Sequence, residues 1–88
     1  MTYADELRDL VYYNTDKESY YKVRKYYESL RGKMKDEAIN GYLSMWADAK
    51  DMAKDFRTFV LVCHFAKLDG IKVEYMDESN EFLFKWLD

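Results

Sequence analysis

Apolar side chains recur at alternating steps of three and four between residues 39 and 63, more regularly than anywhere else in the 88-residue chain. Such spacing lines up one apolar stripe along a helix. The members of this stripe are Ile39, Tyr42, Trp46, Ala49, Ala53, Phe56, Val60 and Cys63. The carboxylates of Asp48, Asp51 and Asp55 fall on the opposite side. The pattern predicts one long amphipathic helix over residues 35–68, straight or kinked near Gly41 or Asp55.

Residues 58–65 leave an alternative open, because their β-branched and aromatic side chains would also suit a buried strand. The residues that follow favour a helix, since Gly70 can end a helix in the left-handed conformation and Ile71 supplies the usual apolar contact after it. The pair Asp69-Gly70 would equally suit a hairpin turn. We favour the helix.

Two shorter helices are expected before the long one. In residues 3–13 the stripe consists of Tyr3, Leu7, Leu10 and Asn14, with Val11 beside it. Thr15 and Glu18 then match a capping box, which predicts a second helix over 16–31. Its apolar positions are Tyr20, Val23, Tyr27 and Leu30, and Gly32 is placed to end it.

The last eighteen residues have the pattern of a β-hairpin. Residues 71–75 alternate apolar and charged side chains, residues 77–80 form a turn cluster, and aromatic side chains recur at every second position from Phe82 to Trp86. The aromatic face needs a partner, and the apolar residues 59–66 supply one. The opposite face carries Met76, Leu83 and Leu87, which suits a partner or a dimer contact.

The predicted fold class is therefore α+β, a small single domain of residues 1–88 with three helices followed by a C-terminal β-hairpin. The aromatic content of 18% helps so short a chain to build a core. Cys63 is the sole cysteine, so a reducing compartment is expected. The sequence begins without the pattern of a signal peptide, and no apolar run is long enough to span a membrane. We expect a cytoplasmic protein that makes no membrane contact.

Catalytic constellations are missing from the sequence. Cys63 and His64 are neighbours whose side chains diverge in a helix or a strand, so they cannot form a nucleophilic pair with each other. One cysteine and one histidine are also too few for a typical zinc site. No glycine-rich phosphate loop is present. We expect no enzymatic activity, no metal and no cofactor. Only an active site formed between subunits and containing Cys63 or His64 would support the hypothesis of an enzyme.

One segment is a candidate binding site because it is both basic and rich in tyrosine. Residues 17–35 carry seven basic and two acidic side chains, a net charge of +5, while the chain as a whole has −3. Tyrosine and arginine are enriched at protein interfaces. The candidate partner-binding residues are Tyr21, Lys22, Arg24, Lys25, Tyr26 and Arg31.

The prediction is a non-enzymatic interaction protein that binds, and in one version inhibits, a protein or a protein–nucleic-acid complex. The alternative is a nucleic-acid-binding module, because lysine and arginine beside tyrosine can neutralise phosphates and stack on bases. A homodimer is compatible with both. The composition is similar to that of short accessory proteins made by bacteriophages and mobile elements against host factors, a likeness that no sequence motif carries.

Overall fold

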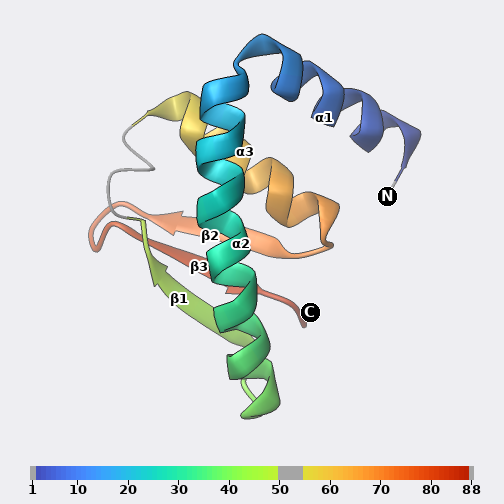
Figure 1. Cartoon of the computed structure of the whole chain (residues 1–88). Coiled ribbons are helices and arrows are strands. Elements are labelled where there is room, and N and C mark those ends of the chain that lie inside the picture. Colours follow the sequence, from blue (N-terminus) through green and yellow to red (C-terminus); the bar gives the residue numbers. More distant parts are fainter. Residues whose placement is uncertain (1, 50–54, 88) are drawn as a thin grey trace.

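Three helices and three strands make up the computed structural model, which describes residues 2–49 and 55–87 (Figure 1). Along the chain they are α1 (Tyr3–Thr15), α2 (Lys17–Ile39), β1 (Ser44–Asp48), α3 (Phe56–Leu68), β2 (Lys72–Met76) and β3 (Glu81–Lys85). The α+β class is confirmed. The predicted order is wrong, because a strand separates the second and third helices and joins the C-terminal hairpin in one sheet.

The long helix predicted for residues 35–68 is also wrong, and so is the predicted end of the second helix at Gly32. Helix α2 continues through Gly32 and ends at Ile39, and Gly41, two residues later, has a φ of +88°. The N–H of Gly41 donates to the carbonyl of Ala38 at 3.0 Å, and the N–H of Tyr42 donates to that of Glu37 at 3.0 Å. These bonds form a Schellman motif, which ends the helix and redirects the chain into β1.

Strand β1 replaces the middle of the predicted helix. Met45 and Ala47 point into the core while Trp46 between them is 53% exposed, so the local period is two. Ile39, at the start of the predicted stripe, is 73% exposed, and Phe56 is 78% exposed. The predicted row of carboxylates is likewise absent from the described residues: Asp48 ends β1 and Asp55 caps α3, while Asp51 lies outside them.

The predictions for the second half of the chain are confirmed where they favoured a helix and a hairpin. Residues 58–65 lie within α3, which the side chain of Asp55 caps by accepting from the N–H of Arg57 at 3.0 Å. Gly70 has a φ of +74°, and the N–H of Ile71 donates to the carbonyl of Ala66 at 2.9 Å. The helix therefore ends in a second Schellman motif and leads directly into β2.

The sheet is antiparallel with the order β1-β3-β2, so the C-terminal strand lies in the middle. Met45 of β1 stands opposite Phe84 of β3, which stands opposite Val73 of β2. Helices α2 and α3 pack on this face of the sheet, and α1 lies on the other side of α3 from the sheet (Figure 1).

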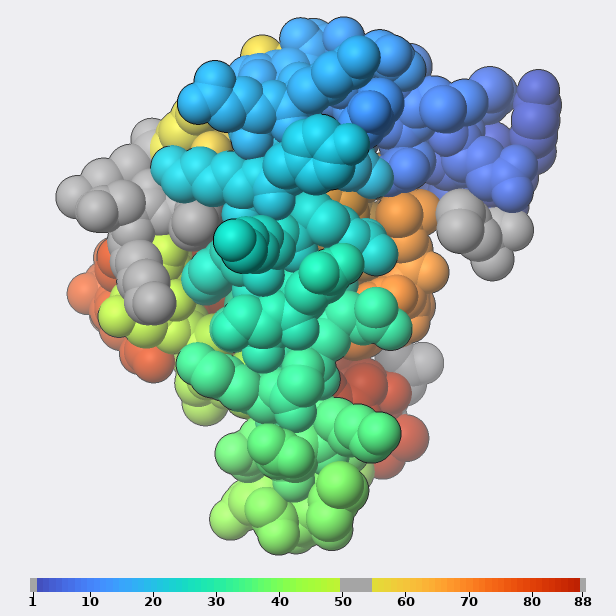
Figure 2. Space-filling model, viewed as in Figure 1, coloured from blue at the N-terminus to red at the C-terminus, as the bar shows by residue number. Residues whose placement is uncertain are grey.

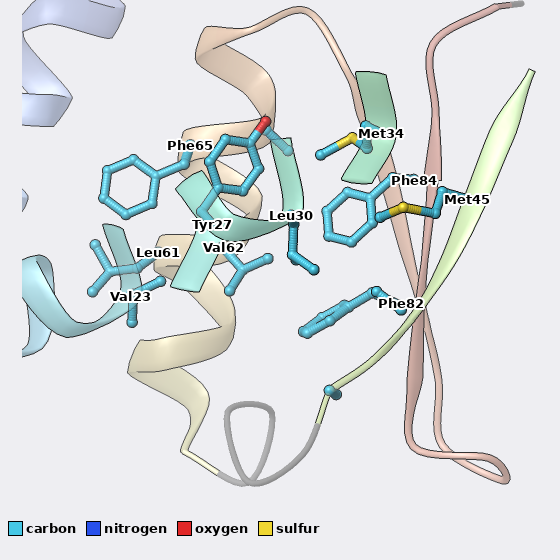
Figure 3. Close-up of a cluster of buried hydrophobic side chains, with 13 residues drawn as sticks. Val23, Tyr27, Leu30, Met34, Met45, Leu61, Val62, Phe65, Phe82 and Phe84 are labelled. Atoms are coloured by element: carbon cyan, nitrogen blue, oxygen red, sulfur yellow. The ribbon is translucent and has the colours of Figure 1, made fainter. Parts of the chain in front are cut away.

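The core lies between α2, α3 and the sheet. Figure 3 shows the side chains of α2 reaching toward α3 on one side and toward the sheet on the other. Its buried members are Val23, Tyr27, Leu30 and Met34 of α2, Leu61, Val62, Phe65 and Ala66 of α3, and Met45, Ala47, Ala49, Phe82 and Phe84 from β1, β3 and the residue after β1. Helix α1 contributes no buried residue to it.

A single residue, Asp16, joins α1 to α2. Its N–H donates to the carbonyl of Tyr12 at 3.4 Å, and its carboxylate accepts from the N–H of Ser19 at 3.1 Å. The predicted N-cap at Thr15 is therefore one residue too early. Asp16 caps the end of one helix and the start of the next, which leaves no linker between them.

Candidate binding surfaces

Helix α1 is attached to the rest of the protein through polar and aromatic contacts. The Oδ1 atom of Asp9 lies 2.9 Å from Nε2 of the buried His64 and accepts from the hydroxyl of Tyr20 at 2.9 Å. The ring of Tyr12 lies 4.7 Å from the ring of His64, and that of Tyr13 lies 5.3 Å from that of Tyr20. The side of α1 that faces α2 and α3 is thus its tyrosine and carboxylate side.

The apolar stripe of α1 faces solvent in consequence. Leu10 is 57% exposed and Val11 is 61% exposed, and Tyr3 and Leu7 of the same stripe are exposed as well. Amphipathic helices in globular proteins ordinarily turn this stripe toward the core. Helix α1 has the reverse orientation, and Figure 2 shows it (blue) as an arm that projects above α3 (orange).

A groove between α1 and the beginning of α3 extends this apolar surface. It has a volume of about 390 Å3 and is lined mainly by Val11, Tyr12, Phe56 and Val60. A neighbouring hollow of about 350 Å3 shares three of these residues and continues to Cys63. We call the exposed residues Tyr3, Leu7, Leu10, Val11 and Phe56, together with the half-buried Val60, the α1–α3 surface.

The charges around the α1–α3 surface are largely paired within the chain. Arg8 forms an ion pair with Asp5 at 3.1 Å, and Arg57 forms one with Asp16 at 3.6 Å. Backbone N–H groups, from Thr2 to Asp5 and from Ser19 to Asp16, are the main cause that lowers the pKa of both carboxyls. The rim therefore presents balanced charge, which suits an apolar partner better than a strongly charged one.

The candidate residues on α2 do not form one cluster. Tyr21 and Lys25 are exposed on the outward side of the helix, and Lys22 is exposed where that side meets the flank of Tyr26. Arg24 and Arg31 lie seven residues apart and so share one flank, whereas Tyr26 lies on the opposite flank.

Tyr21 donates its hydroxyl to that of Tyr13 on α1 at 3.2 Å, and three more of the six candidates take part in contacts that hold the fold together. Arg24 pairs with Glu28 at 3.2 Å and lies 5.1 Å from the ring of Phe65, and Arg31 pairs with Asp69 at 3.2 Å. The list is completed by Tyr26, whose hydroxyl donates to the carbonyl of Asp48 at 2.8 Å. Burial, and then the charge of Asp48, raise the pKa of Tyr26 to about 12.

Four lysines of α2 remain available to a partner. They are Lys22, Lys25, Lys33 and Lys35, which are exposed and form no ion pair within the part of the chain that the structure describes. Lys33 also lines a small pocket of about 180 Å3 between α2 and β1, together with Ser29 and Trp46.

The neighbours Cys63 and His64 have different surroundings, as expected from their divergent directions. His64 is buried and bonded to Asp9, while Cys63 is half-buried beside the hollow along α3. Burial raises the pKa of the Cys63 thiol, which disfavours the reactive thiolate. Among residues 2–49 and 55–87 no group of three or more metal-binding side chains is close enough to hold an ion.

The described helices also include none with the length and apolar character needed to cross a bilayer. Comparison of the chain with protein-family models, with curated protein sequences and with solved structures finds no match. The surfaces themselves are therefore the basis for a functional proposal.

Proposed function

We propose that this chain is a non-enzymatic interaction protein that binds a protein partner through the α1–α3 surface. The observation that carries the proposal is the orientation of α1, whose apolar stripe faces solvent at Leu10 and Val11 while its polar side is bonded to His64. Contiguous exposed apolar patches mark interaction sites in soluble proteins. Helices that present such a stripe are also a common means of recognition between proteins.

The charge around this surface favours a protein over a nucleic acid. Arg8 and Arg57 at its rim are paired with carboxylates, so they offer few uncompensated positive charges to phosphates. Tyr21, Lys22 and Lys25 of α2 remain candidates for a second contact. We assign Arg24, Tyr26 and Arg31, which the sequence placed in the same group, to supporting roles in the packing of α2.

The alternative, a nucleic-acid-binding module, is supported by Lys22, Lys25 and Lys33, which have no acidic partner among the described residues. Such a module would bind single-stranded DNA or RNA with an affinity that falls steeply as salt is added. Replacing Lys22 and Lys25 together would then weaken binding. Lack of a gel shift at low salt would dispose of this alternative.

The proposal is tested by affinity capture followed by mass spectrometry, with and without nuclease. The variant Leu10→Glu places a charge in the middle of the α1–α3 surface, and Ile39→Glu is the matched control because Ile39 is exposed at the far end of α2. We expect a nuclease-resistant partner that the control retains and Leu10→Glu loses.

Two results would contradict the proposal. One is a partner that disappears on nuclease treatment, which would favour the nucleic-acid module. The other is equal capture by the two variants, which would move the contact away from α1. Light scattering of the purified chain separates a third outcome, a dimer in which a second copy covers the surface and which Leu10→Glu converts to monomer.

A further inference from the structure

Strand β1 has one edge that no other strand covers among the described residues, because it ends the order β1-β3-β2. The N–H of Ala49 donates to the carbonyl of Asn80, and the N–H of Trp86 donates to the carbonyl of Leu43. Hydrogen-bonded and non-hydrogen-bonded pairs alternate in an antiparallel ladder, so the backbone groups of the even-numbered residues 44, 46 and 48 point to the open edge.

Tyr26 covers one end of this edge. Its hydroxyl donates to the carbonyl of Asp48 at 2.8 Å, which occupies an acceptor that an added strand would use. The backbone N–H and C=O groups of Ser44 and Trp46 are left facing outward. An exposed edge of this kind is a template for a further strand, and natural proteins block edges that must stay unpaired.

The two sides of the edge differ in chemistry. On the helix side Tyr26, Ser29 and Lys33 line the pocket of about 180 Å3 beside β1. Lys22 lies on the same flank of α2 as these residues, because positions 22, 26, 29 and 33 follow the helical repeat. On the other face of the sheet Trp46 is 53% exposed and stands opposite Leu83 of β3.

We propose that the edge of β1 at Ser44 and Trp46 binds an extended acidic segment of a protein partner as a fourth strand. Side chains of a strand alternate between faces, so acidic residues of the segment would meet Lys33 while the apolar residues between them would meet Trp46. Lys33 supplies the charge complementarity, since it has no acidic partner within the described residues, and Lys22 extends the positive charge of this flank beyond Tyr26.

Charge also selects this edge over the other one. The outer edge of β2 runs into the exposed acidic turn at Asp77 and Glu78, which would repel an acidic segment. The proposal rests on the assignment of the chain as an interaction protein, but it concerns a surface separate from α1. The two surfaces therefore give separate readouts.

The test uses the 15N-labelled chain and a capped synthetic peptide, Glu-Val-Glu-Val-Glu-Val, with the corresponding Lys-Val peptide as a control. We expect the acidic peptide to shift the amide signals of Ser44 and Trp46 and to slow their hydrogen exchange. Cross-strand contacts between peptide and β1 should also be detected. The Lys-Val peptide should leave these signals unchanged.

Two matched pairs of variants locate the contact. Lys33→Gln should weaken peptide binding about two- to fivefold, the usual range for an exposed charge pair, while Lys35→Gln, at a different angle around α2, should not. Ser44→Pro should abolish the effect because it removes an N–H at the edge, while Ser44→Ala should preserve it.

Several results would overturn the proposal: unchanged Ser44 and Trp46 signals at millimolar acidic peptide, equal binding of the Lys-Val peptide, or shifts confined to β2. A single-stranded oligonucleotide that shifts the lysine signals more strongly than the peptide does, without affecting the β1 amides, would also overturn it. Failure here with continued loss of capture by Leu10→Glu would leave the α1–α3 surface as the binding site.

Discussion

Oδ1 of Asp9 lies 2.9 Å from Nε2 of His64, and this contact joins the outer helix α1 to the buried side of α3. The same oxygen accepts from the hydroxyl of Tyr20 on α2. One carboxylate thus connects all three helices. Because it lies on the polar side of α1, it also determines that the apolar stripe of Leu7, Leu10 and Val11 faces outward.

Removing this carboxylate should release α1. Asp9→Ala leaves His64 buried without its acceptor, and we expect the free energy of unfolding to fall by about 2 kcal/mol. Amide hydrogen exchange in α1 should accelerate more than that in α3. Asp9→Asn is the control, since its amide oxygen can still accept from one neighbour and should retain part of the stability. An unchanged urea midpoint for Asp9→Ala would show that the contact does not hold α1.

The three glycines should respond differently to alanine. Gly41→Ala and Gly70→Ala force a side chain into the left-handed region, at φ of +88° and +74°, and each should lower the free energy of unfolding by about 1 kcal/mol. Gly32 lies inside α2 with open space around the position of a Cβ atom. Gly32→Ala should therefore raise the free energy of unfolding by about 0.5–1 kcal/mol. Chemical denaturation measures all three, and a loss at Gly32 would contradict the uninterrupted course of α2.

Stability should fall at alkaline pH through Tyr20. Burial and the hydrogen bond to Asp9 raise the pKa of Tyr20 to about 12, compared with about 10 in an unfolded chain. The protonated hydroxyl is the form that the fold favours, so its contribution is fully present below pH 10 and is lost as the pH rises toward 12. Urea midpoints between pH 8 and 11.5 should decline less steeply for Tyr20→Phe than for the wild type. Identical slopes would show that this hydroxyl plays no part.

Replacing two apolar residues by alanine should change the free energy of unfolding by very different amounts. Phe84 is completely buried in the centre of the sheet, and Phe84→Ala should lower the free energy of unfolding by about 3–5 kcal/mol. Ile39→Ala should change it by less than about 0.5 kcal/mol, because that side chain is 73% exposed. Thermal or urea unfolding distinguishes the two. A large loss of stability for Ile39→Ala would contradict the exposed position of Ile39 and would favour the long apolar helix that the sequence predicts.

The sequence predicts the local elements better than it predicts how they meet. The hairpin and the cap at Gly70 follow from strict alternation and from one glycine followed by an apolar residue. Gly41 carries the same signal, with Tyr42 after it, but the alternating stripe from Ile39 to Cys63 competes with it. In the structure the helix ends before Gly41. Met45 and Ala47 then pair with Phe84 and Phe82 of β3, which residues in a continuous helix could not do.

The candidate site illustrates the same limit. Exposure of Tyr21, Lys22 and Lys25 agrees with their place outside the apolar stripe of α2. The ion pair from Arg31 to Asp69 and the bond from Tyr26 to Asp48 join residues far apart in sequence, so local spacing holds no signal for them. For α1 the stripe itself was visible, but its outward direction depends on Asp9 meeting His64, 55 residues away.

The joint at Asp16 makes α1 a lever. A 13-residue helix is about 20 Å long, so a rotation of about 10° at that one residue would carry the far end of α1 through roughly 3.5 Å. The same rotation displaces Asp9, about halfway along, by about 2 Å, which is enough to separate it from His64. Small torsional changes at Asp16 would thus cause larger displacements at Tyr3. A partner bound near Tyr3 would therefore need less force to break the contact between Asp9 and His64 than a partner bound near Asp16.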